Sequence, residues 1–104
     1  MSSFDEREKS FEKKFVRDEE LQFKVNAKRN KYLGEWAADK LGKSNADKAV
    51  YIDEVIKSDF SEPGDEDVFR KLQADFKKAS VNISDVEIRE QMKLLLERAK
   101  KVFL

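Results

Sequence analysis

Apolar positions recur with a helical period along almost the whole chain, and they predict four helices. The first expected helix covers about residues 5–41, which contain no proline. Later helices are expected from Ser44 to about Ser58, over about residues 66–79, and from Ser84 toward the C-terminal end. No strand pattern competes with these assignments, so the chain is expected to be all-α.

The residues between these segments support the boundaries. Gly42 is expected to end the first helix. Ser44 and Ser84 are expected N-caps, and Glu87 completes a capping box with Ser84. The single proline lies in the turn over residues 61–65. The expected buried positions of the three later helices are Tyr51, Ile52, Val55, Ile56, Val68, Leu72, Phe76, Ala79, Ile88, Met92, Leu95, Ala99 and Val102.

The first predicted helix carries two apolar stripes with different directions. Phe4, Phe11 and Phe15 fall within about 40° of each other on one helix face. A second stripe, centred about 70° away, begins at Leu21. The acidic run 18–20 lies at the change, and acidic residues favour a helix start. Two alternatives follow, namely a hinge near residues 16–20 or one continuous helix with a gradual twist.

Short connections favour antiparallel neighbours, so residues 19–104 are expected to form a four-helix bundle as the body of the protein. Residues 1–18 are then left over as a separate segment that projects or is mobile, because an isolated helix with few apolar contacts is marginal in water. The three phenylalanines of this segment either cap the core of the body or enter a groove in a partner protein.

Composition excludes several function classes. The chain has 104 residues, 42% of them charged, and its 22 basic and 22 acidic residues are interspersed, so no net basic field favours nucleic acid. It contains no cysteine or histidine, and its three glycines are isolated, so we expect no enzyme, metal site or cofactor. No apolar run approaches the roughly 20 residues that span a bilayer, and no signal peptide opens the chain, so a cytoplasmic protein without membrane insertion is expected.

Three further groups have simple structural interpretations. The basic cluster at residues 28–31 could contact an anion or an acidic partner, but a solvated helix face accounts for it. Trp36 is expected in the core, although an exposed contact residue is the alternative. The acidic run 65–67 could bind a cation, but the helix dipole explains three acids at a helix start.

Several blocks of this sequence resemble the zeta inhibitor subunit of alphaproteobacterial F-type ATP synthases. They lie at residues 4–9, 11–15, 18–24, 28–42 and 59–68, and include the sequences Leu-Gly-Glu-Trp-Ala-Ala and Glu-Pro-Gly-Asp-Glu-Asp. The resemblance implies a four-helix body and a mobile N-terminal segment. In that family the segment enters a catalytic alpha/beta interface of the ATPase head and blocks rotation in the hydrolytic direction.

The resemblance also implies the partners and the site. The partners would be the alpha, beta and gamma subunits of the catalytic head, and the protein would associate with the membrane-bound synthase through that head. The implied partner-binding residues are Phe4, Asp5, Arg7, Glu8, Phe11, Lys14 and Phe15. The alternatives are a helical adaptor of another complex, with no link to ATP hydrolysis, and a small-molecule-binding bundle, which would need a cavity.

Overall fold

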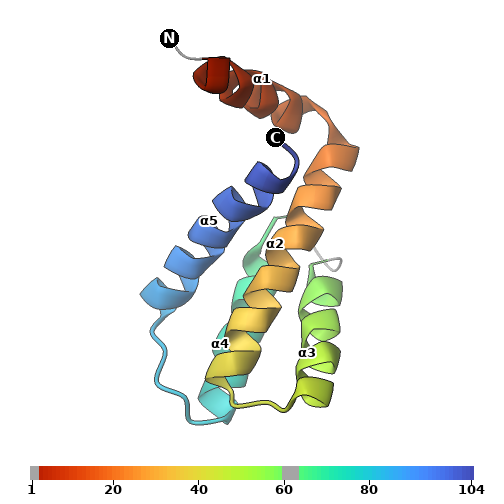
Figure 1. Cartoon of the computed structure of the whole chain (residues 1–104). Coiled ribbons are helices and arrows are strands. Elements are labelled where there is room, and N and C mark those ends of the chain that lie inside the picture. Colours follow the sequence, from red (N-terminus) through yellow and green to blue (C-terminus); the bar gives the residue numbers. More distant parts are fainter. Residues whose placement is uncertain (1–2, 60–63) are drawn as a thin grey trace.

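The computed structural model describes residues 3–59 and 64–104, with side chains described from residue 6 onward. Within these ranges the chain forms five helices and no strand (Figure 1). The helices are α1 (Ser3–Arg17), α2 (Glu19–Lys40), α3 (Asn45–Ser58), α4 (Glu66–Lys78) and α5 (Asp85–Val102). The all-α prediction is confirmed, whereas the more specific assignment as a four-helix bundle stays a prediction.

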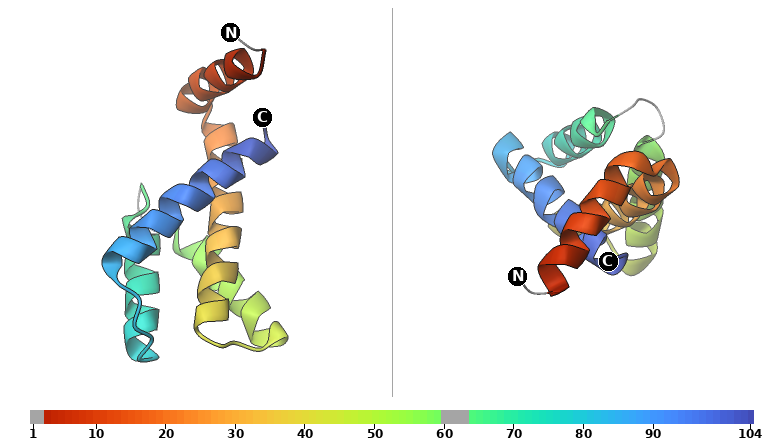
Figure 2. Two further views of the ribbon diagram at one scale, coloured as in Figure 1. Left: turned by 60° about the vertical axis from the view of Figure 1, so that its left-hand side comes forward. Right: turned by 90° about the horizontal axis from the view of Figure 1, so that it is seen from above.

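A corner at Asp18 divides the first predicted helix into two. The backbone of Asp18 is extended (φ −102°, ψ 102°), and its carboxylate accepts a hydrogen bond from the Leu21 N–H at 3.1 Å. Asp18 is therefore the N-cap of α2, which a continuous helix would not need. Figure 2 shows α1 turned across the end of α2 instead of extending it. The hinged alternative is correct, and the continuous one is wrong.

Helices α2–α5 enclose one apolar cluster, which we call the main core. Its buried members are Leu33, Ala37, Ala38, Tyr51, Val55, Val68, Phe69, Leu72, Phe76, Ile88, Met92 and Leu95. Most of the predicted core positions of α3, α4 and α5 are among them. The main core therefore follows from the periodicity of each helix, and α2 supplies the small residues against which the larger ones pack.

Four predicted core positions differ from the structure. Val102 is 51% exposed because it lies in the last turn of α5, and Ala79 is exposed at the C-cap of α4. Ile52 and Ile56 are only half-buried, since they lie at the edge of the α3 face that Tyr51 and Val55 place inward. Phe69 is buried, although the predicted stripe of α4 did not include it.

Most of the predicted helix boundaries are confirmed. Gly42 follows α2 with φ +70°, a left-handed conformation that glycine adopts without strain. The Ser44 hydroxyl accepts from the Asp47 N–H, and the Ser84 hydroxyl accepts from the Glu87 N–H at 3.1 Å. Ser84 also donates to the Glu87 carboxylate at 3.4 Å, so the two capping-box side chains meet. Pro63 of the predicted turn lies outside the described residues.

Candidate functional site

Helix α1 carries all seven predicted partner-binding residues, and the side chains of five of them are described. Phe11 is buried and Phe15 is half-buried, and their rings stack with centroids 6.2 Å apart at an interplanar angle of 13°. Arg7 and Lys14 are exposed, and Glu8 is half-buried. Phe4 and Asp5 lie in the α1 backbone, but their side chains are outside the described part of the chain.

Phe11 packs onto the end of the body away from the main core. It forms a second cluster with Val25 of α2 and Ala99 of α5, which we call the α1 cluster. Phe15, Leu21, Tyr32, Leu96 and Leu104 pack around it. The free chain therefore holds Phe11 at 8% exposure against its own body, as expected for a ring that caps an apolar end.

Polar contacts from α2 and from α5 also hold α1 on the body. The Gln22 amide donates to the carbonyl oxygen of Phe15 at 2.6 Å and to that of Val16 at 3.1 Å. These are carbonyls of the last turn of α1, which lack helical partners, so Gln22 satisfies them at the corner. On α5, the ammonium of Lys100 lies 3.2 Å from the Glu12 carboxylate and 4.7 Å from the centre of the Phe15 ring. Helix α1 is thus tied to both α2 and α5.

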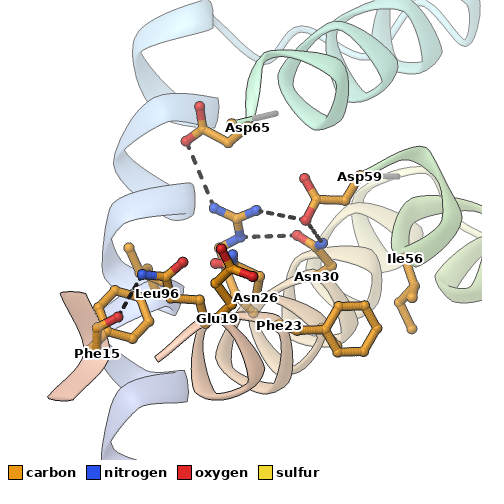
Figure 3. Close-up of a pocket in the computed structure, with 13 residues that line it drawn as sticks. Phe15, Glu19, Phe23, Asn26, Asn30, Ile56, Asp59, Asp65 and Leu96 are labelled. Carbon is orange, nitrogen blue, oxygen red and sulfur yellow. Dashed lines mark hydrogen bonds and ion pairs between the residues drawn. The ribbon is translucent and has the colours of Figure 1, made fainter. Parts of the chain in front are cut away.

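The basic cluster at residues 28–31 is not a uniformly solvated face, and that interpretation is wrong for its two central residues. Arg29 is 4% exposed and Asn30 is 1% exposed. The Arg29 guanidinium lies 3.8 Å from the carboxylates of Asp59 and Asp65, and the Asn30 amide donates to Asp59 at 3.0 Å (Figure 3). The acidic groups come from the end of α3 and the start of α4, so this network joins three helices.

Burial sets the protonation behaviour of this network. Desolvation raises the pKa of Asp59, although the Asn30 hydrogen bond and the charge of Arg29 act in the opposite direction. Desolvation also lowers the pKa of Arg29, against the attraction of the two carboxylates, but an arginine remains protonated in proteins. One oxygen of Asp59 is buried with no hydrogen-bond partner among the described residues, so the network is incompletely satisfied.

Arg29, Asn30, Asp59 and Asp65 also line a cavity of about 660 Å³, to which Phe15 of α1 and several residues of α2 contribute. Figure 3 shows Phe15, Glu19 and Phe23 around it, together with Asn30, Asp59 and Asp65. The cavity meets the geometric requirement of the small-molecule-binding alternative. The Arg29 guanidinium and the Asn30 amide that line the cavity already have partners within the protein. These two groups therefore do not indicate which class of ligand the cavity would bind.

The remaining candidates have structural roles. Trp36 is half-buried against the main core and meets Phe76 edge-on, with centroids 5.6 Å apart, which confirms its core interpretation. Of the acidic run 65–67, Glu66 pairs with Arg89 at 3.0 Å and Asp67 with Arg70. The described residues contain no group of acidic side chains placed to hold a metal ion. None of their helices combines the length and apolarity that a membrane span requires.

Comparisons with known proteins identify the family. The model of the family "ATPase inhibitor subunit zeta" matches residues 1–102. This chain belongs to that family. It is also similar to a protein solved by solution NMR, with 40% sequence identity and a TM-score of 0.71 over 80% of this chain and 94% of that one. The search of curated proteins gives no match.

The sequence block that resembles this family has a packing role in the structure. Leu33, Ala37 and Ala38 are fully buried in the main core. A Cβ atom added to Gly34 would lie 2.9 Å from the Cα of Ile52, so only glycine allows α2 and α3 to approach this closely. The block at residues 28–42, one of several that resemble the zeta family, thus contributes to the packing of the body.

Two contacts were not predicted from the sequence, that of Lys100 with α1 and that of Arg29 with the acidic residues of the buried network. Lys100 was assigned no role, and Arg29 was placed in a solvated cluster. A signal for Arg29 existed in the acidic residues Asp59 and Asp65, which lie just before and at the end of the predicted turn. No sequence signal connects Lys100 with Glu12, because 88 positions separate them.

Proposed function

We propose that this protein inhibits ATP hydrolysis by an F-type ATP synthase, and that α1 is its inhibitory segment. The family match over residues 1–102 is the observation that carries this proposal. The protein would act as a regulatory subunit without catalysis of its own. Its partners would be the alpha, beta and gamma subunits of the catalytic head, and it would reach the synthase from the cytoplasm.

The mechanism that we propose is steric. Helix α1 would enter a catalytic alpha/beta interface, and the bulk of α2–α5 would then prevent the rotation that hydrolysis requires. Two features of the chain support this division. Helix α1 is a separate helix before the Asp18 corner, and it carries two stacked aromatic rings, Phe11 and Phe15, on the face that packs on the body.

The energetics of insertion are compatible with these residues. Ordering a segment in a cleft costs about 2–5 kcal/mol. Relative to an undocked α1 with exposed rings, burial of Phe4, Phe11 and Phe15 would contribute about 1.5–3 kcal/mol each and offset that cost. Arg7, Glu8 and Lys14 would set the register of the helix through ion pairs, and the exposure of Arg7 and Lys14 leaves both available for this role.

The test is an inhibition titration of the purified ATPase head with three forms of the chain. Wild type should inhibit hydrolysis, and Phe11→Ser should inhibit much less because the central ring is lost. Val50→Ser is the control, since this apolar side chain is 61% exposed on α3. Equal inhibition by all three forms would contradict the role of α1.

The alternative function, a helical adaptor of another complex, makes a different prediction. A pull-down from cells with this chain as bait should recover ATPase alpha, beta and gamma subunits if the proposal is correct. Recovery of another complex without these subunits would favour the adaptor.

A further inference from the structure

We propose that the body of this protein regulates its own inhibitory segment, with Lys100 of α5 holding α1 in a docked state that cannot inhibit. This inference rests on the proposed function, because it concerns the availability of α1. In Figures 1 and 2 the C-terminal end of α5 lies directly beneath α1. The docked state is the one that the structure shows.

The first argument is that one apolar face of α1 serves two incompatible purposes. Phe11 is 8% exposed in the α1 cluster, where it contacts residues of α2 and α5. The same ring is proposed to be buried in a cleft of the ATPase. A side chain cannot be enclosed by the body and by a partner at once, so α1 must leave the α1 cluster before it can insert.

The second argument is the position of Lys100. Its side chain is 12% exposed, and its ammonium lies between the Glu12 carboxylate of α1 at 3.2 Å and Glu97 of its own helix at 3.4 Å. The same ammonium lies 4.7 Å from the Phe15 ring centre, within the range of a cation–π contact. Lys100 therefore contacts both an acidic and an aromatic residue of α1, and Glu97 holds it in place.

The third argument is that the docked state can open without unfolding the body. The Asp18 corner separates α1 from α2, and the buried members of the two clusters do not overlap, although the half-buried Tyr32 packs against both. Segments with few buried contacts open at low free energy while the rest of a protein stays folded. Inhibition then depends on the intrinsic affinity of α1 for the ATPase and on the fraction of molecules in which α1 is undocked.

Hydrogen exchange tests the docking contact without the ATPase. Lys100→Met keeps the apolar stem of the side chain and removes the charge. The amides of α1 should then exchange about two to five times faster, as expected for the loss of a partly exposed ion pair. Amides of α4 should be unchanged. Lys78→Met, at an exposed position on α4, is the matched control and should leave α1 unaffected. Unchanged α1 exchange in Lys100→Met would overturn the role of Lys100.

A reversible cross-link tests the consequence for inhibition. The chain has no cysteine, so a Glu12→Cys/Lys100→Cys variant can be joined by a short bismaleimide that contains a cleavable disulfide. The cross-linked form should lose at least about tenfold in inhibitory potency, because a population shift of that size accompanies a locked docked state. Reduction of the linker should restore inhibition. A Glu66→Cys/Arg89→Cys variant, joined in the same way between α4 and α5, should inhibit in both forms.

The outcomes separate this inference from the proposed function. Full inhibition by the cross-linked Glu12/Lys100 variant would overturn the docking proposal and leave the inhibitory function intact. Absence of inhibition by wild type and by every reduced variant would overturn the proposed function, and with it the regulatory role of docking.

Discussion

The main core and the α1 cluster are both apolar, but they differ in how many helices they unite. The main core takes buried residues from all four helices of the body, and several have no exposed surface. Among the described side chains of α1, from residue 6 onward, Phe11 is the one that the α1 cluster buries, at 8% exposure. Cooperative stability grows with such shared burial, so the two regions should respond to mutation differently. A segment that must leave the body to bind another protein is better held by the α1 cluster, which buries fewer residues than the main core.

The largest expected effect is a difference in stability between alanine variants of two buried phenylalanines, Phe76 in the main core and Phe11 in the α1 cluster. Phe76→Ala should lower the free energy of unfolding by about 3–5 kcal/mol, because Phe76 is 1% exposed in the main core. Phe11→Ala can cost no more than the docking free energy of α1, which we expect to be about 1 kcal/mol. Urea unfolding followed by circular dichroism measures both. Equal losses would place Phe11 in the same cooperative unit as Phe76.

Next in size is the buried network that holds α2 to the α3–α4 connection. Arg29→Met should cost about 3 kcal/mol near pH 7, since it leaves the Asp59 carboxylate buried without its cation. Lys57→Met removes an exposed ion pair with Asp53 and should cause no measurable change. If Lys57→Met lowered the free energy of unfolding as much as Arg29→Met, burial would not explain the stability contributed by the Arg29 network.

The stability that Arg29→Met loses relative to wild type should become smaller as the pH falls. The folded-state pKa of Asp59 lies above its unfolded value, so proton binding favours the folded state, and this contribution is lost as the pH rises through the folded pKa. Without Arg29 the pKa of Asp59 rises further. Acidification through that pKa should therefore reduce the stability difference between variant and wild type. A difference that grows on acidification would contradict this account.

A smaller effect is expected at the closest approach of α2 and α3. Gly34→Ala should destabilise by up to about 2 kcal/mol net, because the new methyl group meets the Ile52 backbone at 2.9 Å at a steric cost of about 1–3 kcal/mol. This steric cost exceeds the gain of about 1 kcal/mol that alanine brings to a helix. Thermal unfolding gives the comparison, and a higher melting temperature for Gly34→Ala would show that the two helices are not in such close contact.

The smallest expected effect is the response of inhibition to pH. The chain has no histidine, so inhibition of an ATPase corrected for its own pH dependence should show no step near about pH 6.5. We expect release to follow nucleotide occupancy and the direction of rotation. Inhibition measured from pH 6 to 8 tests this, and a sharp transition would indicate a perturbed carboxylate or a switch in the partner.

Local features of the fold could be predicted from sequence, and long-range ones could not. The capping residues Ser44 and Ser84, the glycine stop at Gly42 and the stripes of α3–α5 depend on neighbours within a few positions. The choice between a hinge and a continuous helix at Asp18 depends on whether Phe11 finds a surface, and Ala99 of that surface is 88 positions away along the chain. Arg29 likewise meets Asp59 only after α2 and α3 pack.

For the candidate site, too, the local features could be predicted from the sequence and the long-range contacts could not. Its aromatic residues and their shared face follow from the spacing of Phe11 and Phe15, and the stacked rings agree with that spacing. Docking of these rings on the body was left open as one of two alternatives, because periodicity within a helix does not reveal which surface covers it.

The central claim is that α1 inhibits while the body folds alone, and deletion of residues 1–17 tests it most directly. The shortened chain keeps Asp18 as the N-cap of α2 and the whole main core. We predict a free energy of unfolding within about 1 kcal/mol of wild type, together with complete loss of ATPase inhibition. A shortened chain that unfolds, or one that inhibits as well as the full chain, would contradict the claim.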